Sequence, residues 1–121
     1  ENDTICRSFT TYCNSALSGT YTINPSGSGS TNFKTFGAAD SALISCGVSG
    51  PVEFIVVAGT YTTQMDIPSI TGASATNTIT FNGGAGNAST RILAFAGTAA
   101  NPYTLRFNGC SYVTFKNMTI R

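Results

Sequence analysis

The chain has 121 residues, of which only 9% are charged, and its formal net charge is +1. A near-neutral chain with six scattered Lys and Arg residues has no basic surface for binding nucleic acid. Because it contains no histidine, we exclude a Ser-His-Asp or Cys-His nucleophile system and a catalytic zinc site with imidazole ligands.

The first segment, residues 1–17, is polar and aperiodic, and we expect a tail tied down by disulfides. The four cysteines are too irregularly spaced to be paired zinc ligands, and they favour disulfides: Cys6, Cys13, Cys46 and Cys110. Four cysteines allow three pairings. We favour Cys6–Cys13, which closes a short N-terminal loop, and Cys46–Cys110, which ties the early part of the chain to the late part. The second bridge closes the longer loop and would restrict the unfolded chain more. Disulfides indicate an oxidising compartment, such as the periplasm or the cell exterior.

The next segment, residues 18–50, combines an N-terminal strand with the one predicted helix. Thr35 is placed to cap the first turn of this helix and Gly47 to end it. A single apolar stripe recurs at helical spacing over about residues 36–46, formed by Phe36, Ala39, Leu43 and Cys46. We expect this helix to cap an exposed hydrophobic end of the remaining fold.

Residues 51–121 consist of short apolar segments bounded by Gly, Asn, Ser or Pro, which predicts strands throughout. The expected strands cover residues 52–57, 64–67, 78–81, 91–95, 103–107, 112–115 and 118–120. No apolar run reaches the roughly 18 residues of a membrane-spanning helix. The chain is therefore expected to be all-β apart from its one helix.

Similar strand triplets recur along this segment. Ile55, Ile79 and Leu105 begin triplets that are 24 and 26 residues apart, and Met65, Ile92 and Val113 mark a second series of similar pitch. A period in the twenties built from several short strands indicates the coils of a solenoid.

Two Asn-Gly dipeptides, at 82–83 and 108–109, would also fit the hairpins of an antiparallel sandwich. Both follow a phenylalanine, one expected coil apart, which favours a turn repeated in each coil of a parallel β-helix. The final strands carry no capping element, and we expect residues 51–121 to be the first coils of a β-helix that is truncated at its C-terminal end.

Several strings of residues resemble known families. A helix, an apolar strand and then Gly59-Thr60-Tyr61-Thr62 resemble the start of pectin methylesterases, and residues 72–81 and 112–120 look like the large secreted right-handed β-helix proteins of Bacteroidetes. This resemblance covers residues 18–121. It implies a right-handed parallel β-helix of the pectin-lyase-like type, exported by the type IX secretion system to the cell surface, with a structural or adhesive role.

The same resemblance leaves an alternative open. The chain would then be the N-terminal part of a polysaccharide-active, pectin esterase- or lyase-like enzyme whose catalytic coils lie beyond residue 121. The expected partners are the secretion and cell-envelope machinery or surface glycans. Asp-Ser/Thr-aliphatic strings resemble the O-glycosylation signal of those bacteria, with Thr4 and Ser41 as acceptors, and three tyrosines are candidates for stacking on sugars: Tyr61, Tyr103 and Tyr112.

No catalytic, cofactor or metal site is expected in these residues. Acid–base chemistry on glycans needs two carboxyl groups within about 5–10 Å of each other, and we place Glu53 and Asp66 on different faces of the coil. Asn117 is interpreted as an inward turn asparagine that stacks on its equivalent in the next coil. Three Thr-x-Thr pairs begin at Thr20, Thr60 and Thr78. Aligned threonines on a flat β-helix face can bind ice, but these pairs are expected on different faces, which argues against that role.

Overall fold

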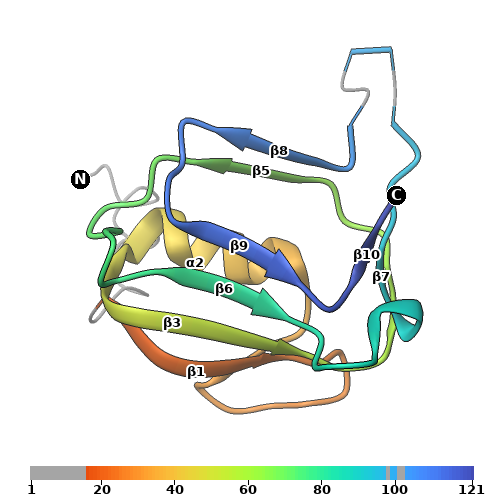
Figure 1. Cartoon of the computed structure of the whole chain (residues 1–121), viewed down its shortest axis with the longest axis horizontal. Helices are drawn as coiled ribbons and strands as arrows, with labels where there is room; N and C mark the ends of the chain where they lie inside the picture. The colour runs from red at the N-terminus through yellow and green to blue at the C-terminus, as the bar shows by residue number, and fades with distance from the viewer. Residues whose placement is uncertain (1–15, 98, 101–102) are drawn as a thin grey trace, which may run out of the picture.

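Short parallel strands make up most of the fold (Figure 1). The structure, a computed structural model, describes residues 16–97, 99–100 and 103–121. The first elements are β1 Leu17–Ile23, β2 Asn32–Phe33, α2 Phe36–Cys46, β3 Val48–Val56, β4 Gly59–Tyr61 and β5 Met65–Pro68. They are followed by β6 Ile79–Asn82, the short 3-10 helix η1 Ala88–Thr90, β7 Arg91–Leu93, β8 Leu105–Asn108, β9 Val113–Lys116 and β10 Thr119–Ile120.

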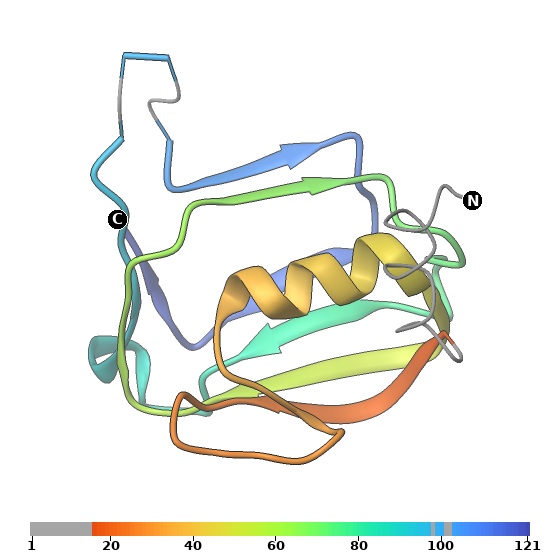
Figure 2. The ribbon, with the colours of Figure 1, turned by 180° about the vertical axis from the view of Figure 1, so that it is seen from behind.

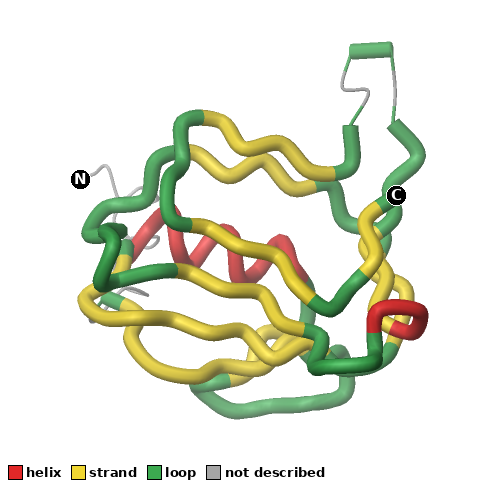
Figure 3. Tube along the Cα trace, in the orientation of Figure 1, coloured by secondary structure: helices red, strands yellow, loops and turns green. Residues whose placement is uncertain are grey.

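The strands form three sheets, and every pairing between named strands is parallel. The first sheet has the order β2-β1-β3-β6-β9, the second β10-β7-β4 and the third β5-β8. From β3 onward the chain visits the first, second and third sheets in turn and then repeats this order. Figure 1 shows the sheets on different sides of a common interior. The strands far outnumber the helical segments (Figure 3), and mostly strands, parallel sheets and a single described α-helix are compatible with the predicted all-β class.

Aromatic side chains stacked across the first sheet form the centre of the core. Phe54 pairs in register with Phe81, which pairs with Phe115. The ring centroids are 4.7 Å apart for the first pair and 4.5 Å for the second, with the rings nearly parallel. Because alternate residues of a strand face opposite sides, the flanking Val52 and Val56 of β3 point inward as well and are buried.

Helix α2 begins and ends where the sequence predicts. The Thr35 hydroxyl accepts a hydrogen bond from the Ala38 N–H at 3.0 Å, and the Gly47 N–H donates to the Leu43 carbonyl at 2.8 Å. Gly47 has a φ of 69°, a conformation that favours glycine at this position. A Cβ there would lie 2.5 Å from the Thr71 carbonyl oxygen, so glycine is required for space as well.

The apolar face of α2 packs into the common interior. It contacts β1, β2 and β5, and Figure 2 shows the helix crossing in front of the sheets when the molecule is seen from behind. Phe36, Ala39 and Leu43 are fully buried, as the apolar stripe predicts. The Phe36 ring lies edge-on to Tyr61 of β4, with centroids 5.0 Å apart. The helix therefore joins the interior faces of several strands rather than lying on an outer surface.

The pairing partners differ from the two predicted series. Ile79 pairs with Val52 and Val113, which are 27 and 34 residues away, whereas Leu105 pairs with Met65, 40 residues away. The predicted constant pitch in the twenties is therefore wrong. Connections of unequal length join the strands, so similar triplets at equal spacing do not lie in equivalent places.

The two Asn-Gly dipeptides are not equivalent either. Asn82 ends β6 in the first sheet, whereas Asn108 ends β8 in the third sheet and pairs with Pro68. Two short strands, β2 and β4, are missing from the sequence prediction, and β3 begins four residues earlier than expected. Each of the missed strands has only two or three residues, too few for a visible alternation.

The phenylalanine stack predicts a strong effect of core truncation. Phe81→Ala removes a fully buried ring from between two others, and we expect the free energy of unfolding to fall by about 3–5 kcal/mol. Urea denaturation measures this change. Phe107→Ala is the matched control, because the Phe107 side chain is 54% exposed and its loss should cost under about 1 kcal/mol. Equal losses in the two variants would contradict the stack as the centre of the core.

Candidate functional site

The three predicted sugar-stacking tyrosines lie in different environments. Tyr61 is only 6% exposed, and its hydroxyl donates a hydrogen bond to the Val57 carbonyl at 2.7 Å. Burial raises the pKa of this phenol. Sugar stacking at Tyr61 is therefore wrong: it occupies an inward position of β4, where its ring fills core space beside Phe36. Tyr112 is 50% exposed and remains a candidate.

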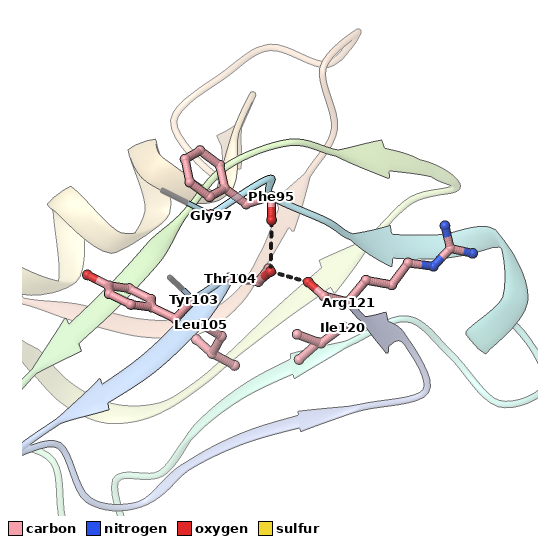
Figure 4. A pocket seen from close by; sticks show the side chains of 7 residues that line it. All are labelled: Phe95, Gly97, Tyr103, Thr104, Leu105, Ile120 and Arg121. Carbon is pink, nitrogen blue, oxygen red and sulfur yellow. Dashed lines mark hydrogen bonds between the residues drawn. The ribbon is translucent and has the colours of Figure 1, made fainter. Parts of the chain in front are cut away.

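Tyr103 lines a cavity of about 440 Å³ where the second and third sheets approach each other (Figure 4). The Thr104 hydroxyl lies within hydrogen-bond distance of the Phe95 and Arg121 carbonyl oxygens and can donate its one proton to either, so this group is already used within the protein. The Arg106 guanidinium lies 4.6 Å from the centre of the Tyr103 ring. One face of the ring is therefore already covered by a cation, which weakens the case for stacking there. The lining residues are Phe95, Gly97, Tyr103, Thr104, Leu105, Ile120 and Arg121.

Two carboxyl groups that are distant in the sequence, Asp40 and Asp66, lie close enough beside the third sheet to interact electrostatically. Asp66 of β5 pairs in register with Arg106 of β8, and Asp66 Oδ2 lies 2.5 Å from an Arg106 terminal nitrogen. The hydrogen bond from Arg106 lowers the pKa of Asp66. Asp40 of α2 is half-buried, and its pKa is raised to about 6 by burial and by the nearby Asp66 carboxylate.

In this pair Asp66 is the ionised carboxylate, and Asp40 is the neighbouring carboxyl that holds its proton more tightly. Asp40 Oδ1 and Asp66 Oδ1 are both buried and accept no hydrogen bond from another described residue. Neither residue lines the cavity around Tyr103. Glu53 lies on β3 in the first sheet, whereas Asp66 lies on β5 in the third sheet, so these two carboxylates are on different faces as expected. Among the described residues, no group of three or more His, Cys, Asp or Glu could hold a metal ion.

A chain of side-chain amides crosses the first sheet. The Asn117 amide donates to Asn82 Oδ1 at 2.8 Å, and the Asn82 amide donates to Glu53 Oε2 at 2.9 Å. Asn117 was expected to stack on an equivalent asparagine in the next coil, but its observed partner is Asn82, earlier in the chain. The part that Glu53 plays in this chain was missed, because Glu53 is 29 residues from Asn82 and no local pattern links them.

The threonine pairs were expected on different faces, and this is only partly correct. Thr20 lies on β1 and Thr80 on β6, so two of the pairs belong to the same sheet, whereas Thr60 lies on β4 in the second sheet. Strand β3 separates the two pairs and places Glu53 between them. The first sheet thus has a polar outer face built from strands that are far apart in sequence.

The cysteines differ from the predicted pairing. Cys46 is disulfide-bonded and Cys110 carries a free thiol, so the predicted Cys46–Cys110 bridge is wrong. Loop-closure entropy indicates which bridge would stabilise most, but it carries no information on which side chains meet. The partner of Cys46 lies outside the described residues, as do Cys6 and Cys13. Burial raises the pKa of the partly buried Cys110 thiol.

The two candidate glycosylation acceptors are placed unequally. Ser41 lies on α2 and is exposed, so its hydroxyl is accessible to a transferase. Thr4 lies outside the described residues. In the described part of the chain, α2 is too short to cross a bilayer, and no other helix has the length or apolar character to do so.

Comparisons with protein-family models, with curated proteins and with solved structures find no match to this chain.

The raised pKa of Asp40 predicts a pH-dependent cost to stability. An unfolded Asp has a pKa near 3.9, so the folded state binds this proton more tightly and loses stability as the pH rises through about 6. We expect Asp40→Asn to raise the free energy of unfolding at pH 7.5 by about 1 kcal/mol, allowing for solvent screening of a half-exposed group. Near pH 4 the gain should disappear. Urea unfolding at both pH values measures it.

Asp66→Asn is the control for this prediction, with the opposite sign. Because Arg106 lowers the pKa of Asp66, its contribution is present above the unfolded pKa and is lost as the pH falls through the folded pKa. This variant should therefore lower stability at pH 7.5. A gain from Asp40→Asn that is the same at pH 4 and pH 7.5 would contradict the electrostatic explanation.

The state of the two described cysteines predicts their reactivity. Without reductant, a thiol reagent should label Cys110 but not Cys46. Since the thiolate is the reactive form and burial raises the pKa of Cys110, labelling at pH 8 should be slower than in urea. Peptide mass mapping locates the label, and Cys110→Ser removes it. Label on Cys46 in the unreduced protein would contradict the assignment.

Proposed function

We propose that this chain is the non-catalytic N-terminal segment of a secreted cell-surface protein with a structural or adhesive role. Its strands wind as a right-handed parallel β-helix, and α2 caps the first coil. The observation that supports this most is the repeated order of the three sheets, in which each strand from β3 onward pairs in parallel with the next strand assigned to its sheet. Such winding produces a long, regular surface, which suits scaffolding or adhesion.

The burial of apolar side chains differs between the two ends of the proposed β-helix, and this difference supports the proposed cap. Helix α2 packs against β1 and β5 and fills the interior with Phe36 and Leu43. On the other side, β8 and β10 leave Phe107 54% and Ile120 38% exposed. A further coil would cover these apolar side chains, which is consistent with an N-terminal segment of a longer β-helix.

The proposed location rests on covalent chemistry and on the family resemblance. A disulfide at Cys46 is typical of proteins that fold in an oxidising compartment. Ser41 is exposed on α2, as O-glycosylation of the Asp40-Ser41-Ala42 string requires. Export by the type IX secretion system, and contact with envelope machinery or surface glycans, follow from the resemblance. The alternative, a polysaccharide-active enzyme whose catalytic coils lie beyond residue 121, receives no comparable support from the described residues.

Localisation in the source cells tests this proposal. We expect antibody against the chain to label intact cells, external protease to remove the signal, and loss of the type IX secretion system to abolish it. Peptide mapping of the surface fraction should find Cys46 oxidised and a sugar mass on Ser41, which Ser41→Ala removes. A cytoplasmic protein with reduced Cys46, or turnover of a polysaccharide by the purified chain, would overturn the proposal.

A further inference from the structure

The outer face of the first sheet carries a row of polar side chains that runs across four strands. The register aligns Thr20 of β1 with Glu53 of β3, then with Thr80 of β6 and Thr114 of β9. All four are exposed or half-buried, because the opposite face of these strands holds the core. We call this row and its neighbour Thr78 the threonine face. A shallow cavity of about 290 Å³ lies on it, lined by Gly19, Thr20, Pro51, Val52, Glu53, Thr78 and Thr80.

Glu53 is held in place within this cavity before any ligand arrives. Its Oε2 accepts the Asn82 amide at 2.9 Å. Asn82 is itself fixed, because its Oδ1 accepts the Asn117 amide and the Gly84 N–H, each at 2.8 Å. Within the described chain Glu53 Oε1 has no hydrogen-bond partner. An acceptor whose position is already fixed loses little conformational entropy when a ligand binds.

Free hydrogen-bonding groups surround this fixed carboxylate. The hydroxyls of Thr20, Thr78 and Thr80 form no hydrogen bonds with other described residues, although each can donate once and accept twice. Gly19 adds open space, since a Cβ at that position would meet nothing within 4 Å. The cavity therefore offers several hydroxyls and one carboxylate oxygen to a ligand, with little steric obstruction.

The charge of the cavity selects among ligands. Among the described residues that line it, Glu53 is the one ionisable group and none is a cation. A polyanion such as pectate would be repelled, whereas sugar hydroxyls can donate to the carboxylate in charge-assisted hydrogen bonds. The backbone of Tyr112 lies next to Thr78, because its carbonyl accepts the N–H of Ile79. Its half-exposed ring provides an apolar surface of the kind on which sugars stack.

We propose that the threonine face binds a neutral polysaccharide, with Glu53 accepting hydrogen bonds from sugar hydroxyls and Thr80 and Thr20 extending the contact across the strands. This inference rests on the adhesive role proposed above and names the ligand class for it. It places the contact on the first sheet, away from the cavity at Tyr103 and from Asp40 and Asp66.

Binding of defined polysaccharides tests this inference. The probes are soluble xylan, a galactomannan and a β-glucan as neutral chains, with polygalacturonate as the anionic one, in affinity gel electrophoresis and calorimetry. We expect saturable binding to at least one neutral chain and none to polygalacturonate. Glu53→Gln keeps an oxygen for the Asn82 amide but removes the charge, and binding should weaken about tenfold because charge-assisted bonds are the stronger ones.

Matched threonine variants locate the contact. Thr80→Val removes one hydroxyl from the threonine face at nearly constant volume and should weaken binding about three- to tenfold, as expected for a hydrogen bond to a ligand. Thr60→Val makes the same change at an exposed position of β4 in the second sheet and should leave binding unchanged. Urea midpoints of all variants establish that the fold is retained.

The outcomes separate this inference from the proposed function. If surface-exposed protein adheres to glycans but Glu53→Gln and Thr80→Val bind as tightly as the unmodified chain, the threonine face is wrong and the adhesive role stands. Preference for polygalacturonate, or no binding to any neutral chain, also overturns the inference. A cytoplasmic location overturns the proposed function regardless of what the threonine face binds.

Discussion

Register between parallel strands is the constraint on which the remaining structure depends. Because side chains alternate between the two faces of a strand, a slip of one residue would move Phe81 from the core to solvent and expose its neighbours Thr80 and Asn82 to the opposite environment. The stacking of Phe81 between Phe54 and Phe115, at 4.7 and 4.5 Å, opposes such a slip. One set of interior contacts thus determines which residues are available on the outside.

The polar chain through Asn117, Asn82 and Glu53 follows from the same register. Asn82 aligns with Lys116, the residue before Asn117, and this brings the two amides within hydrogen-bond distance. Asn117 has a φ of 58°, a left-handed conformation that asparagine tolerates better than most residues. The stacked rings in the interior and the amide chain on the outer face require the same strand register, so each supports the other.

Local signals in the sequence predicted the local structure well. The helix begins at Phe36 and ends at Cys46 as expected, since Thr35 and Gly47 carry the chemistry of a cap within a few residues. The sequence predicts the strand at Ile79 equally clearly, but it does not predict which strands pair with it. Pairing with Val52 and Val113 depends on the lengths of the intervening connections, which no short pattern records. The proximity of Asp40 to Asp66 and the linkage of Glu53 to Asn82 are tertiary facts of the same kind.

The low charge of the chain makes the placement of each ionic group important at the sheet edges. The edge strands β8 and β9 carry the exposed cations Arg106 and Lys116, and a charged side chain on an edge discourages pairing with another cationic strand. The exposed Phe107 on β8 has the opposite tendency, because covering its ring removes apolar surface from water. A strand that pairs here must bring apolar inward side chains without placing cations opposite Arg106 or Lys116. These edges therefore disfavour nonspecific association, but they can still pair with a strand of matching chemistry.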